Sequence, residues 1–440
     1  MTSSYFAPLL SELSTRAARA TISKLGFSNP SLRRHLLEVF ARGYGQPGCF
    51  LGDPVFEATF GWKQADTALV DLGGKLIHPA LVEAMNNPWG ESAKDYQFPR
   101  EARPYTHQLE AWKALSEPDY RSVVVTSGTG SGKTECFMVP VLSSLAAAAA
   151  QRQKLEGVRA LFLYPLNALI QSQRERLRAW TGPFGGGVRF CLYNGMTPEE
   201  AKADKYRSAP NEVHDRKTLR QSPPPILVTN PTMLEYMLVR AQDAPILEKS
   251  KGMLEWIVLD EAHNYTGSQA AGVALLLCRV LHAFGSKADR VRFIATSATI
   301  GSDDGDAKLQ LQEFLAKLAG VHSDRVVVVE GERHVPQVND PIAPAHPVSL
   351  EALAGDPDDT EGRYRRLSTH PVSRGIRDLF VPAVSKRGFQ PLSAIKRYLQ
   401  AARCAHDDEA ALAWLDLLTN ARSGEGRVSK TFLPLRVHAF

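Results

Sequence analysis

The sequence is poor in cysteine and has no long run of apolar residues. Its five cysteines, scattered from Cys49 to Cys404, include no C-x-x-C pair, so we expect neither a zinc site nor a disulfide framework. No stretch of about 18 consecutive apolar residues is present, which argues against a membrane span. Residues 1–27 also lack the apolar segment of a signal peptide. These absences predict a cytoplasmic protein with no membrane partner.

The bulk composition is that of an ordinary globular protein. The chain has 440 residues, of which 44% are apolar and 22% charged, so it can bury cores of normal size in two or three domains. The net charge of +5 is compatible with a polyanionic partner without requiring one.

Between residues 101 and 330, short apolar runs rich in β-branched residues alternate with helical segments. Strands that are almost continuously apolar are buried on both faces, as in a parallel sheet. The pattern therefore predicts an α/β domain whose parallel sheet is covered by helices on both faces. The expected strands are 122–126, 160–164, 188–193, 226–229, 256–259, 292–295 and 325–329.

The flanking segments differ from this pattern. We expect residues 1–100 to form a helical N-terminal module, in which the apolar segment 52–62 (GDPVFEATFGW) packs on the next domain or faces a substrate. Residues 331–365 are rich in Pro, Asp and Gly and read as a linker. Helical spacing returns in residues 366–440, which are expected to start a following domain.

A glycine-rich loop follows the first of these strands. Residues 127–134 read SGTGSGKT and precede an apolar helical stretch, which is the context of a Walker A phosphate loop. Backbone amides of such a loop bind phosphate oxygens, Lys133 is expected to contact the β- and γ-phosphates of ATP, and Thr134 to ligate Mg²⁺. The expected ATP-binding residues of the loop are Ser127, Gly128, Thr129, Gly130, Ser131, Gly132, Lys133 and Thr134.

An acidic pair ends a later strand, in the sequence WIVLDEAH of residues 256–263. By the general scheme for phosphoryl transfer in P-loop enzymes, Asp260 is expected to hold Mg²⁺. Glu261 is expected to orient and deprotonate the attacking water, with Lys133 as the other catalytic residue.

These residues resemble motifs I and II of the DEAD/DEAH-box helicases of superfamily 2, in which a small residue is common at the position of Ser127. Further motifs of that family occur in the same order. The resemblance implies a RecA-like lobe, adenine recognition by Gln108, and coupling of ATP state to nucleic acid by His263, Ser297 and Thr299. It also implies nucleic-acid contacts from the segments YPLNAL (164–169) and TNPTML (229–234). The contact residues are Pro165, Asn167, Thr229, Asn230 and Pro231.

Two segments indicate which subgroup of these helicases the sequence resembles. YPLNAL and the stretch 260–279 (DEAHNYTGSQAAGVALLLCR) are similar to the large Lhr-like and MrfA-like helicases, which implies 3′-to-5′ movement on DNA. The N-terminal module of residues 1–100, with its segment 52–62, also resembles the large helicases of Druantia-type anti-phage systems, which implies a role in anti-phage defence and defence-system subunits as partners.

A complete motor of this superfamily has a second RecA-like lobe that supplies arginines to the transferred phosphate. No Q-x-x-G-R-x-G-R motif is present, so we expect this chain to depend on a second lobe, in cis or in trans. Two alternatives to a DNA motor stay open: an RNA-remodelling helicase, and a lobe that binds nucleic acid without turnover. Arg174, Arg176 and Arg178 are candidates for phosphate contacts, or else the solvated face of a helix.

Overall fold

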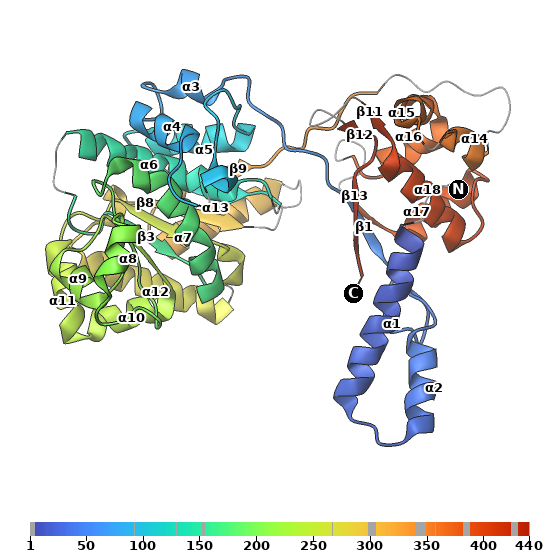
Figure 1. The fold of residues 1–440 in the computed structure, drawn as a ribbon, viewed down its shortest axis with the longest axis horizontal. Coiled ribbons are helices and arrows are strands. Elements are labelled where there is room, and N and C mark those ends of the chain that lie inside the picture. The colour runs from blue at the N-terminus through green and yellow to red at the C-terminus, as the bar shows by residue number, and fades with distance from the viewer. Residues whose placement is uncertain are drawn as a thin grey trace. The chain divides into compact units, whose positions relative to one another are not determined.

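The computed structural model describes residues 5–91, 93–128, 130–151, 155–265, 267–297, 305–338, 349–356, 358–381, 388–423 and 430–439. Within this part of the chain, no helix is both long and apolar enough to cross a membrane. The chain divides into two compact units. Unit 1 comprises Met1–Gly61 and Arg333–Phe440, and unit 2 comprises Trp62–Glu332 (Figure 1).

Unit 2 is built on an eight-stranded sheet with the order β5-β4-β6-β3-β7-β8-β2-β9, in which every pairing is parallel. The expected α/β fold class is confirmed. Every strand expected from the sequence is present, and the two-residue β5 is an addition. The strands are β2 (Ser122–Thr126), β3 (Ala160–Leu163), β4 (Phe190–Leu192), β5 (Glu212–Val213), β6 (Ile226–Thr229), β7 (Trp256–Leu259), β8 (Arg292–Ser297) and β9 (Val326–Glu330).

Successive side chains of a strand point to opposite sides of the sheet, and in these strands both sides are apolar. Helices therefore cover both faces of the sheet. Val123 and Val125 of β2 belong to one apolar cluster, whereas Val124 between them belongs to the other. The first cluster includes residues of α4 (Pro79–Asn86), α5 (Thr106–Ser116), α6 (Lys133–Ala150) and α7 (Asn167–Thr181). The second includes residues of α9 (Arg216–Gln221), α10 (Pro231–Val239), α11 (Ala244–Lys249), α12 (Gly267–Ala283) and α13 (Gly305–Ala319). Unit 2 also contains α3 (Leu69–Leu72) and α8 (Ala203–Ser208).

The segment expected to form one N-terminal module is divided between the two units. Residues 62–100 belong to unit 2, because α3 and α4 add apolar side chains such as Leu69 and Leu81 to the first cluster of the sheet. The amide of Trp89 also donates a hydrogen bond to the carbonyl of Ala179, at the end of α7.

Unit 1 joins the N-terminal segment to the C-terminal one. Its central sheet has the antiparallel order β10-β1-β13, so Val55–Ala58 pairs with the C-terminal segment and not, as expected, with residues 101–330. Only Trp62, at the end of the segment 52–62, belongs to unit 2, where its ring contacts that of His107. Phe56 and Phe60 enter its apolar core. The elements are α1 (Phe6–Leu25), α2 (Pro30–Phe40), β1 (Val55–Ala58), α14 (Leu350–Ala354), α15 (Thr360–Thr369), α16 (Pro371–Asp378), β10 (Phe389–Pro391), α17 (Leu392–Ala401), α18 (Asp408–Asn420), β11 (Arg422–Ser423), β12 (Lys430–Thr431) and β13 (Leu435–His438).

The packing in unit 2 yields a stability prediction. Phe162 of β3 is fully buried and meets Phe137 of α6 edge to face, with ring centroids 5.5 Å apart. Phe162→Ala should therefore lower the free energy of unfolding by about 3–5 kcal/mol. Urea unfolding followed by tryptophan fluorescence measures this, since most of the tryptophans (Trp62, Trp89, Trp112, Trp180 and Trp256) lie in unit 2. Met196→Ala, at a side chain that is 72% exposed, should change it by less than about 0.5 kcal/mol. Equal effects of the two substitutions would contradict the assigned packing.

Candidate functional site

The phosphate loop turns between β2 and α6 through two glycines in the left-handed region. Gly130 and Gly132 have φ values of 73° and 72°, which side chains other than glycine rarely adopt. A Cβ at Gly132 would also lie 2.3 Å from Nε2 of Gln108. The expected loop is therefore formed as a tight curve at the N-terminus of α6. Thr129, an expected member, lies outside the described residues.

Two serines brace this loop. The hydroxyls of Ser127 and Ser131 are 2.6 Å apart, and both side chains are buried. The amide of Ser127 donates to the carbonyl of Ser297 at the end of β8. Ser127 thus replaces the glycine of the strict Walker pattern with a hydroxyl that bonds across the loop, while Gly128 next to it is partly exposed.

Gln108 connects the preceding helix to the loop. Its Oε1 accepts from the amide of Tyr105 at 2.9 Å, and its Nε2 donates to the carbonyl of Gly132 at 3.1 Å. An amide side chain can donate twice and accept twice, so one donor and one acceptor of Gln108 stay available for a purine edge. His107 strengthens the same connection through a 2.8 Å contact between Nε2 and the carbonyl of Ser131.

The acidic pair lies at the carboxyl end of β7. Asp260 is 7% exposed, and its carboxylate accepts a hydrogen bond from the hydroxyl of Thr296 on β8. Burial raises the pKa of Asp260, and the charge of Glu261 adds to this effect. Glu261 itself has a φ of 51°, which is uncommon for a residue with a side chain and turns its carboxylate toward Lys133, with Oε1 at 3.8 Å from Nζ. Thr296 was not foreseen from the sequence.

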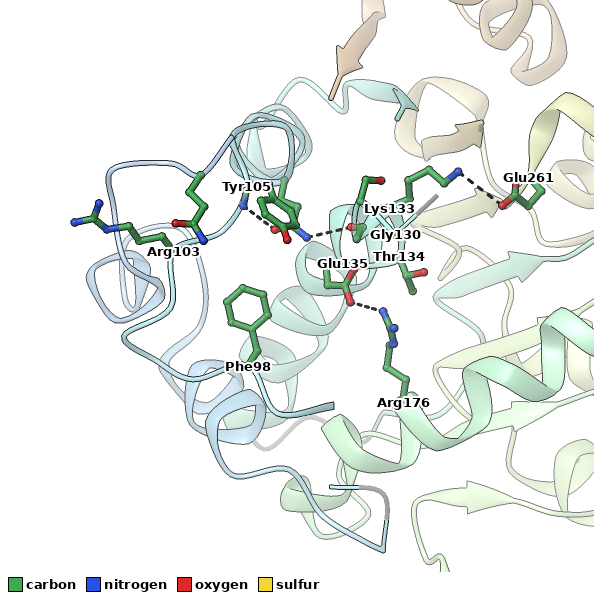
Figure 2. A pocket seen from close by; sticks show the side chains of 13 residues that line it. Phe98, Arg103, Tyr105, Gly130, Lys133, Thr134, Glu135, Arg176 and Glu261 are labelled. Atoms are coloured by element: carbon green, nitrogen blue, oxygen red, sulfur yellow. Dashed lines mark hydrogen bonds and ion pairs between the residues drawn. The ribbon is translucent and has the colours of Figure 1, made fainter. Parts of the chain in front are cut away.

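A cavity of about 560 Å³ is lined by the end of this loop and by Glu261 of the acidic pair (Figure 2). The ammonium of Lys133 is buried and has no hydrogen-bond partner among the described residues. Buried polar groups are normally hydrogen-bonded, so this ammonium is suited to binding an anion. With the glycine curve beside it, the site fits a nucleoside triphosphate. The lining residues are Gln64, Phe98, Arg103, Tyr105, Gln108, Gly130, Ser131, Gly132, Lys133, Thr134, Glu135, Arg176 and Glu261.

The residues expected to hold Mg²⁺ supply few ligands by themselves. Thr134 lines the cavity, whereas Asp260 does not, and no cluster of three or more His, Cys, Asp or Glu in the described part of the chain could hold a metal ion. Mg²⁺ typically binds to one or two protein groups together with water and substrate phosphates. Thr134 and Asp260 therefore fit a metal that arrives with the nucleotide.

An arginine that sequence reasoning did not assign to this cavity forms part of its wall. Arg176 of α7 makes an ion pair with Glu135, the residue after Thr134. Its guanidinium also stacks on Tyr96 and Trp180, at 5.4 and 5.8 Å from the ring centroids. Only the adjacency of Glu135 to the phosphate loop could have suggested this pair, because Arg176 lies far away in the sequence.

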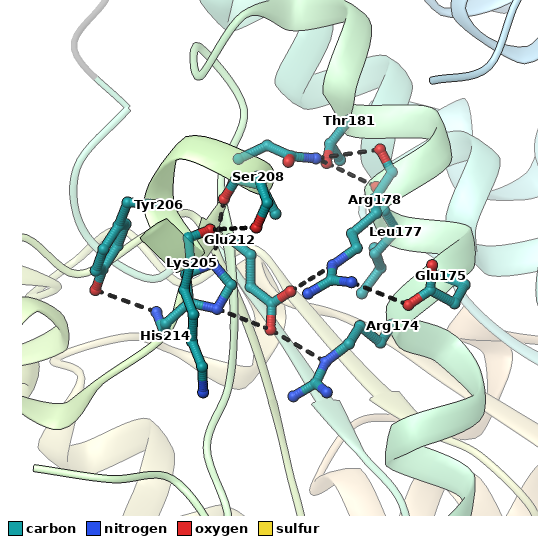
Figure 3. Close-up of polar contacts among 12 residues, drawn as sticks. Arg174, Glu175, Leu177, Arg178, Thr181, Lys205, Tyr206, Ser208, Glu212 and His214 are labelled. Carbon is teal, nitrogen blue, oxygen red and sulfur yellow. Dashed lines mark hydrogen bonds and ion pairs between the residues drawn. The ribbon is translucent and has the colours of Figure 1, made fainter. Parts of the chain in front are cut away.

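The other two arginines of α7 are also compensated. Arg174 and Arg178 both pair with Glu212, whose side chain is 2% exposed, at 3.1 and 2.7 Å (Figure 3). His214 contacts the same carboxylate at 3.6 Å, and burial lowers the pKa of this histidine. These arginines are thus partly exposed and are held in ion pairs with a buried carboxylate. They anchor α7 to β5.

The two segments expected to contact nucleic acid lie next to each other, because β3 and β6 are neighbouring strands. The side-chain amide of Asn230 donates to that of Asn167 at 2.8 Å, and Asn230 also caps α10. Pro165 and Pro231 flank these asparagines and are partly exposed. Thr229 does not belong to this surface, because it is fully buried and its hydroxyl donates to the carbonyl of Tyr193.

The expected coupling residues are only partly described. His263 is exposed, with Nδ1 at 3.1 Å from the carboxylate of Glu261. Ser297 accepts the hydrogen bond from the phosphate loop described above. Thr299 lies outside the described residues.

The family comparison agrees with this geometry. The DEAD/DEAH box helicase family matches residues 105–306, which include the phosphate loop, the acidic pair and both asparagines. These residues form a DEAD/DEAH box helicase domain. The expected relationship to Lhr-like and Druantia helicases is also found.

The helicase domain is similar to domains of much longer proteins. The Druantia protein DruE of Escherichia coli is 29% identical over 328 residues, covering 52% of this chain and 18% of DruE. The uncharacterized ATP-dependent helicase YprA of Bacillus subtilis is 34% identical over 203 residues, covering 45% of this chain and 23% of YprA. Among solved structures, the DUF1998 helicase MrfA bound to DNA has 25% identity and a TM-score of 0.42, covering 63% of this chain and 30% of MrfA. The chain thus spans about a fifth of the length of these two curated relatives.

The buried acid of the helicase domain predicts a pH-dependent effect. The pKa of Asp260 is higher in the folded protein than in the unfolded one. At pH 7 the ionised carboxylate therefore lowers the free energy of unfolding, and this penalty disappears as the group becomes protonated near pH 4. Asp260→Asn should therefore have a higher urea midpoint than the unsubstituted chain at pH 7, and the difference should shrink as the pH falls toward 4. A variant that is less stable at pH 7 would show that ionised Asp260 is stabilising.

The Arg176–Glu135 pair predicts that a second substitution, at Glu135, restores the Mg-ATP affinity that is lost when Arg176 is replaced. Arg176→Met leaves the Glu135 carboxylate uncompensated in the cavity wall, so the affinity for Mg-ATP should fall about tenfold. Arg176→Met combined with Glu135→Gln should restore most of that affinity. Isothermal titration with ATP and with adenosine checks the cause, because a charge effect acts only on the nucleotide with phosphates. An equal loss for adenosine would mean that Arg176 shapes the cavity sterically.

Proposed function

We propose that this chain is the ATP-binding lobe of a DNA helicase or translocase. The observation that carries the proposal is the cavity lined by the phosphate loop together with Lys133, Thr134 and Glu261. Lys133 would bind the β- and γ-phosphates, and Thr134 and Asp260 would hold Mg²⁺, which supplies charge neutralisation when bound. Glu261 would orient and deprotonate the attacking water. Gln108 would bind the adenine edge with the donor and acceptor that it does not use internally.

Nucleic acid would bind at the edge formed by the ends of β3 and β6. Exposed Asn167, bonded to Asn230, offers neutral polar groups next to backbone amides, which suit phosphate oxygens and do not read sequence. Ser297 and His263 would relate the state of the nucleotide to this edge, as would Thr299. The segments 164–169 and 260–279 support DNA over RNA, since they resemble Lhr-like and MrfA-like helicases, and they support 3′-to-5′ movement.

Fast turnover in this proposal requires a second RecA-like lobe in cis or in trans. Arginines from such a lobe contribute about 10³–10⁵ in rate to related phosphoryl transfers, so the chain alone should bind Mg-ATP but hydrolyse it slowly. Similarity to the Druantia protein DruE supports a role in anti-phage defence with other defence subunits.

The test is ATP binding and hydrolysis by the 440-residue chain, with and without single-stranded DNA or RNA. Lys133→Ala should abolish nucleotide binding. Glu261→Gln should preserve binding and lower hydrolysis at least a hundredfold, since it removes a general base. Glu235→Gln, at an exposed acid of α10, is the matched control and should leave both unchanged.

The outcomes discriminate among the three functions. Stimulation of hydrolysis by DNA supports the DNA motor, and stimulation by RNA alone favours the RNA helicase. Nucleic-acid binding with no hydrolysis above that of Glu261→Gln would mean a lobe that binds without turnover. For the defence role, phages should plate equally well on cells that carry the Lys133→Ala protein and on cells without it.

A further inference from the structure

A helical hairpin of unit 1 consists of α1 and α2. The amides of Tyr5 and Phe6 donate to the carboxylate of Asp416 on α18, at 3.0 and 3.1 Å, which anchors the start of α1. Phe6 and Leu10 continue into the apolar core of the unit. Gly26, with a φ of 63°, ends α1, and α2 follows after a short turn (Figure 1).

The distal part of this hairpin adds little to the core. None of the residues of α2 is buried, and none belongs to the core cluster of unit 1. Beyond Leu10, α1 buries only Ser14, Ala18 and Ile22, a stripe at helical spacing. The hairpin therefore presents most of its surface to solvent, and its composition there is not explained by packing.

That surface carries uncompensated positive charge. The cations Arg19, Lys24, Arg33, Arg34 and Arg42 are all exposed, and none of them makes an ion pair with another described residue. Arg16 is paired with Glu12 at 2.5 Å, and Glu38 is the one other acid between residues 5 and 42. At the spacing of a helix, Arg19 and Lys24 lie away from the buried stripe of α1.

Unit 2, in contrast, carries no net charge. It contains as many acidic as basic residues, so the net charge of +5 resides in unit 1. The arginines of α7, nearest in sequence to the proposed nucleic-acid edge, are neutralised by Glu135 and Glu212. Neither the net charge of unit 2 nor the arginines of α7 therefore supply net attraction for a polyanion, whereas unit 1 carries an excess of positive charge.

We propose that the α1–α2 hairpin is a second nucleic-acid contact, which binds the phosphate backbone without reading sequence. This rests on the proposed function, in that the chain acts on nucleic acid. Clustered Arg and Lys that displace counterions from phosphates provide sequence-independent affinity that falls steeply with salt. Exposed cations that make no ion pair with a described residue, on two neighbouring helices, meet this requirement, whereas cations held in ion pairs must first lose their partners.

The experiment compares two variants of the 440-residue chain that lose equal charge. The hairpin variant carries Arg19→Gln, Lys24→Gln, Arg33→Gln and Arg34→Gln. The control carries Lys63→Gln, Lys217→Gln, Lys308→Gln and Lys317→Gln, at exposed lysines of unit 2 that are already paired with glutamates. Fluorescence anisotropy with a single-stranded DNA oligonucleotide gives the affinity at a series of salt concentrations.

The hairpin variant should bind at least tenfold more weakly at low salt, with a log–log salt slope that is smaller by about two to three than that of the unsubstituted chain. The control variant should keep most of its DNA affinity at low salt and most of its salt slope. Circular dichroism checks that both variants fold, and Arg33→Glu with Arg34→Glu, confined to α2, should reproduce the loss.

Two results would overturn the inference. Equal slopes for the hairpin variant and the control would remove the hairpin from the contact and leave the proposed function intact. No binding of DNA or RNA by the unsubstituted chain would overturn the proposed function together with this inference.

Discussion

The buried ammonium of Lys133 is the group on which the candidate site depends. A cation out of contact with water is costly unless an anion or a set of acceptors compensates it, and Glu261 at 3.8 Å does so only in part. The φ of Glu261 and the hydrogen bond from its amide to Thr296 hold that carboxylate in position. The cavity thus holds a positive charge that Glu261 compensates only in part, an arrangement that a magnesium-bound triphosphate would complete.

The order of the strands turns this local chemistry into a candidate motor lobe. Ligands of open α/β sheets bind at the carboxyl ends of the strands. Here β2, β8 and β7 bring the phosphate loop, Ser297 and the acidic pair together, while β3 and β6 place Asn167 beside Asn230 further along the same edge. Helix α7 spans both regions, because it begins at Asn167 and carries Arg176 in the cavity wall.

Sequence patterns predicted the sheet and the phosphate loop well, because these depend on local signals: runs of β-branched residues, glycines before a lysine, and acids at a strand end. They failed where partners are remote in sequence. Arg176 reaches Glu135 only because α6 and α7 contribute to the same apolar cluster on one face of the sheet, and β1 pairs with β10 and β13 from the far end of the chain. Thr229 was expected at the surface on motif resemblance alone, yet its hydroxyl satisfies the buried carbonyl of Tyr193.

The distribution of charge separates two kinds of nucleic-acid contact. A translocating lobe has to release and rebind its track in each ATP cycle, which favours neutral groups such as Asn167 whose hydrogen bonds depend on precise geometry. Strong fixed cations at that edge would hold phosphates in every state of the nucleotide. Pairing the arginines of α7 with Glu135 and Glu212 compensates the positive charge of that helix. In the proposed arrangement, the exposed cations of the α1–α2 hairpin keep the protein near its track while the helicase domain moves along it.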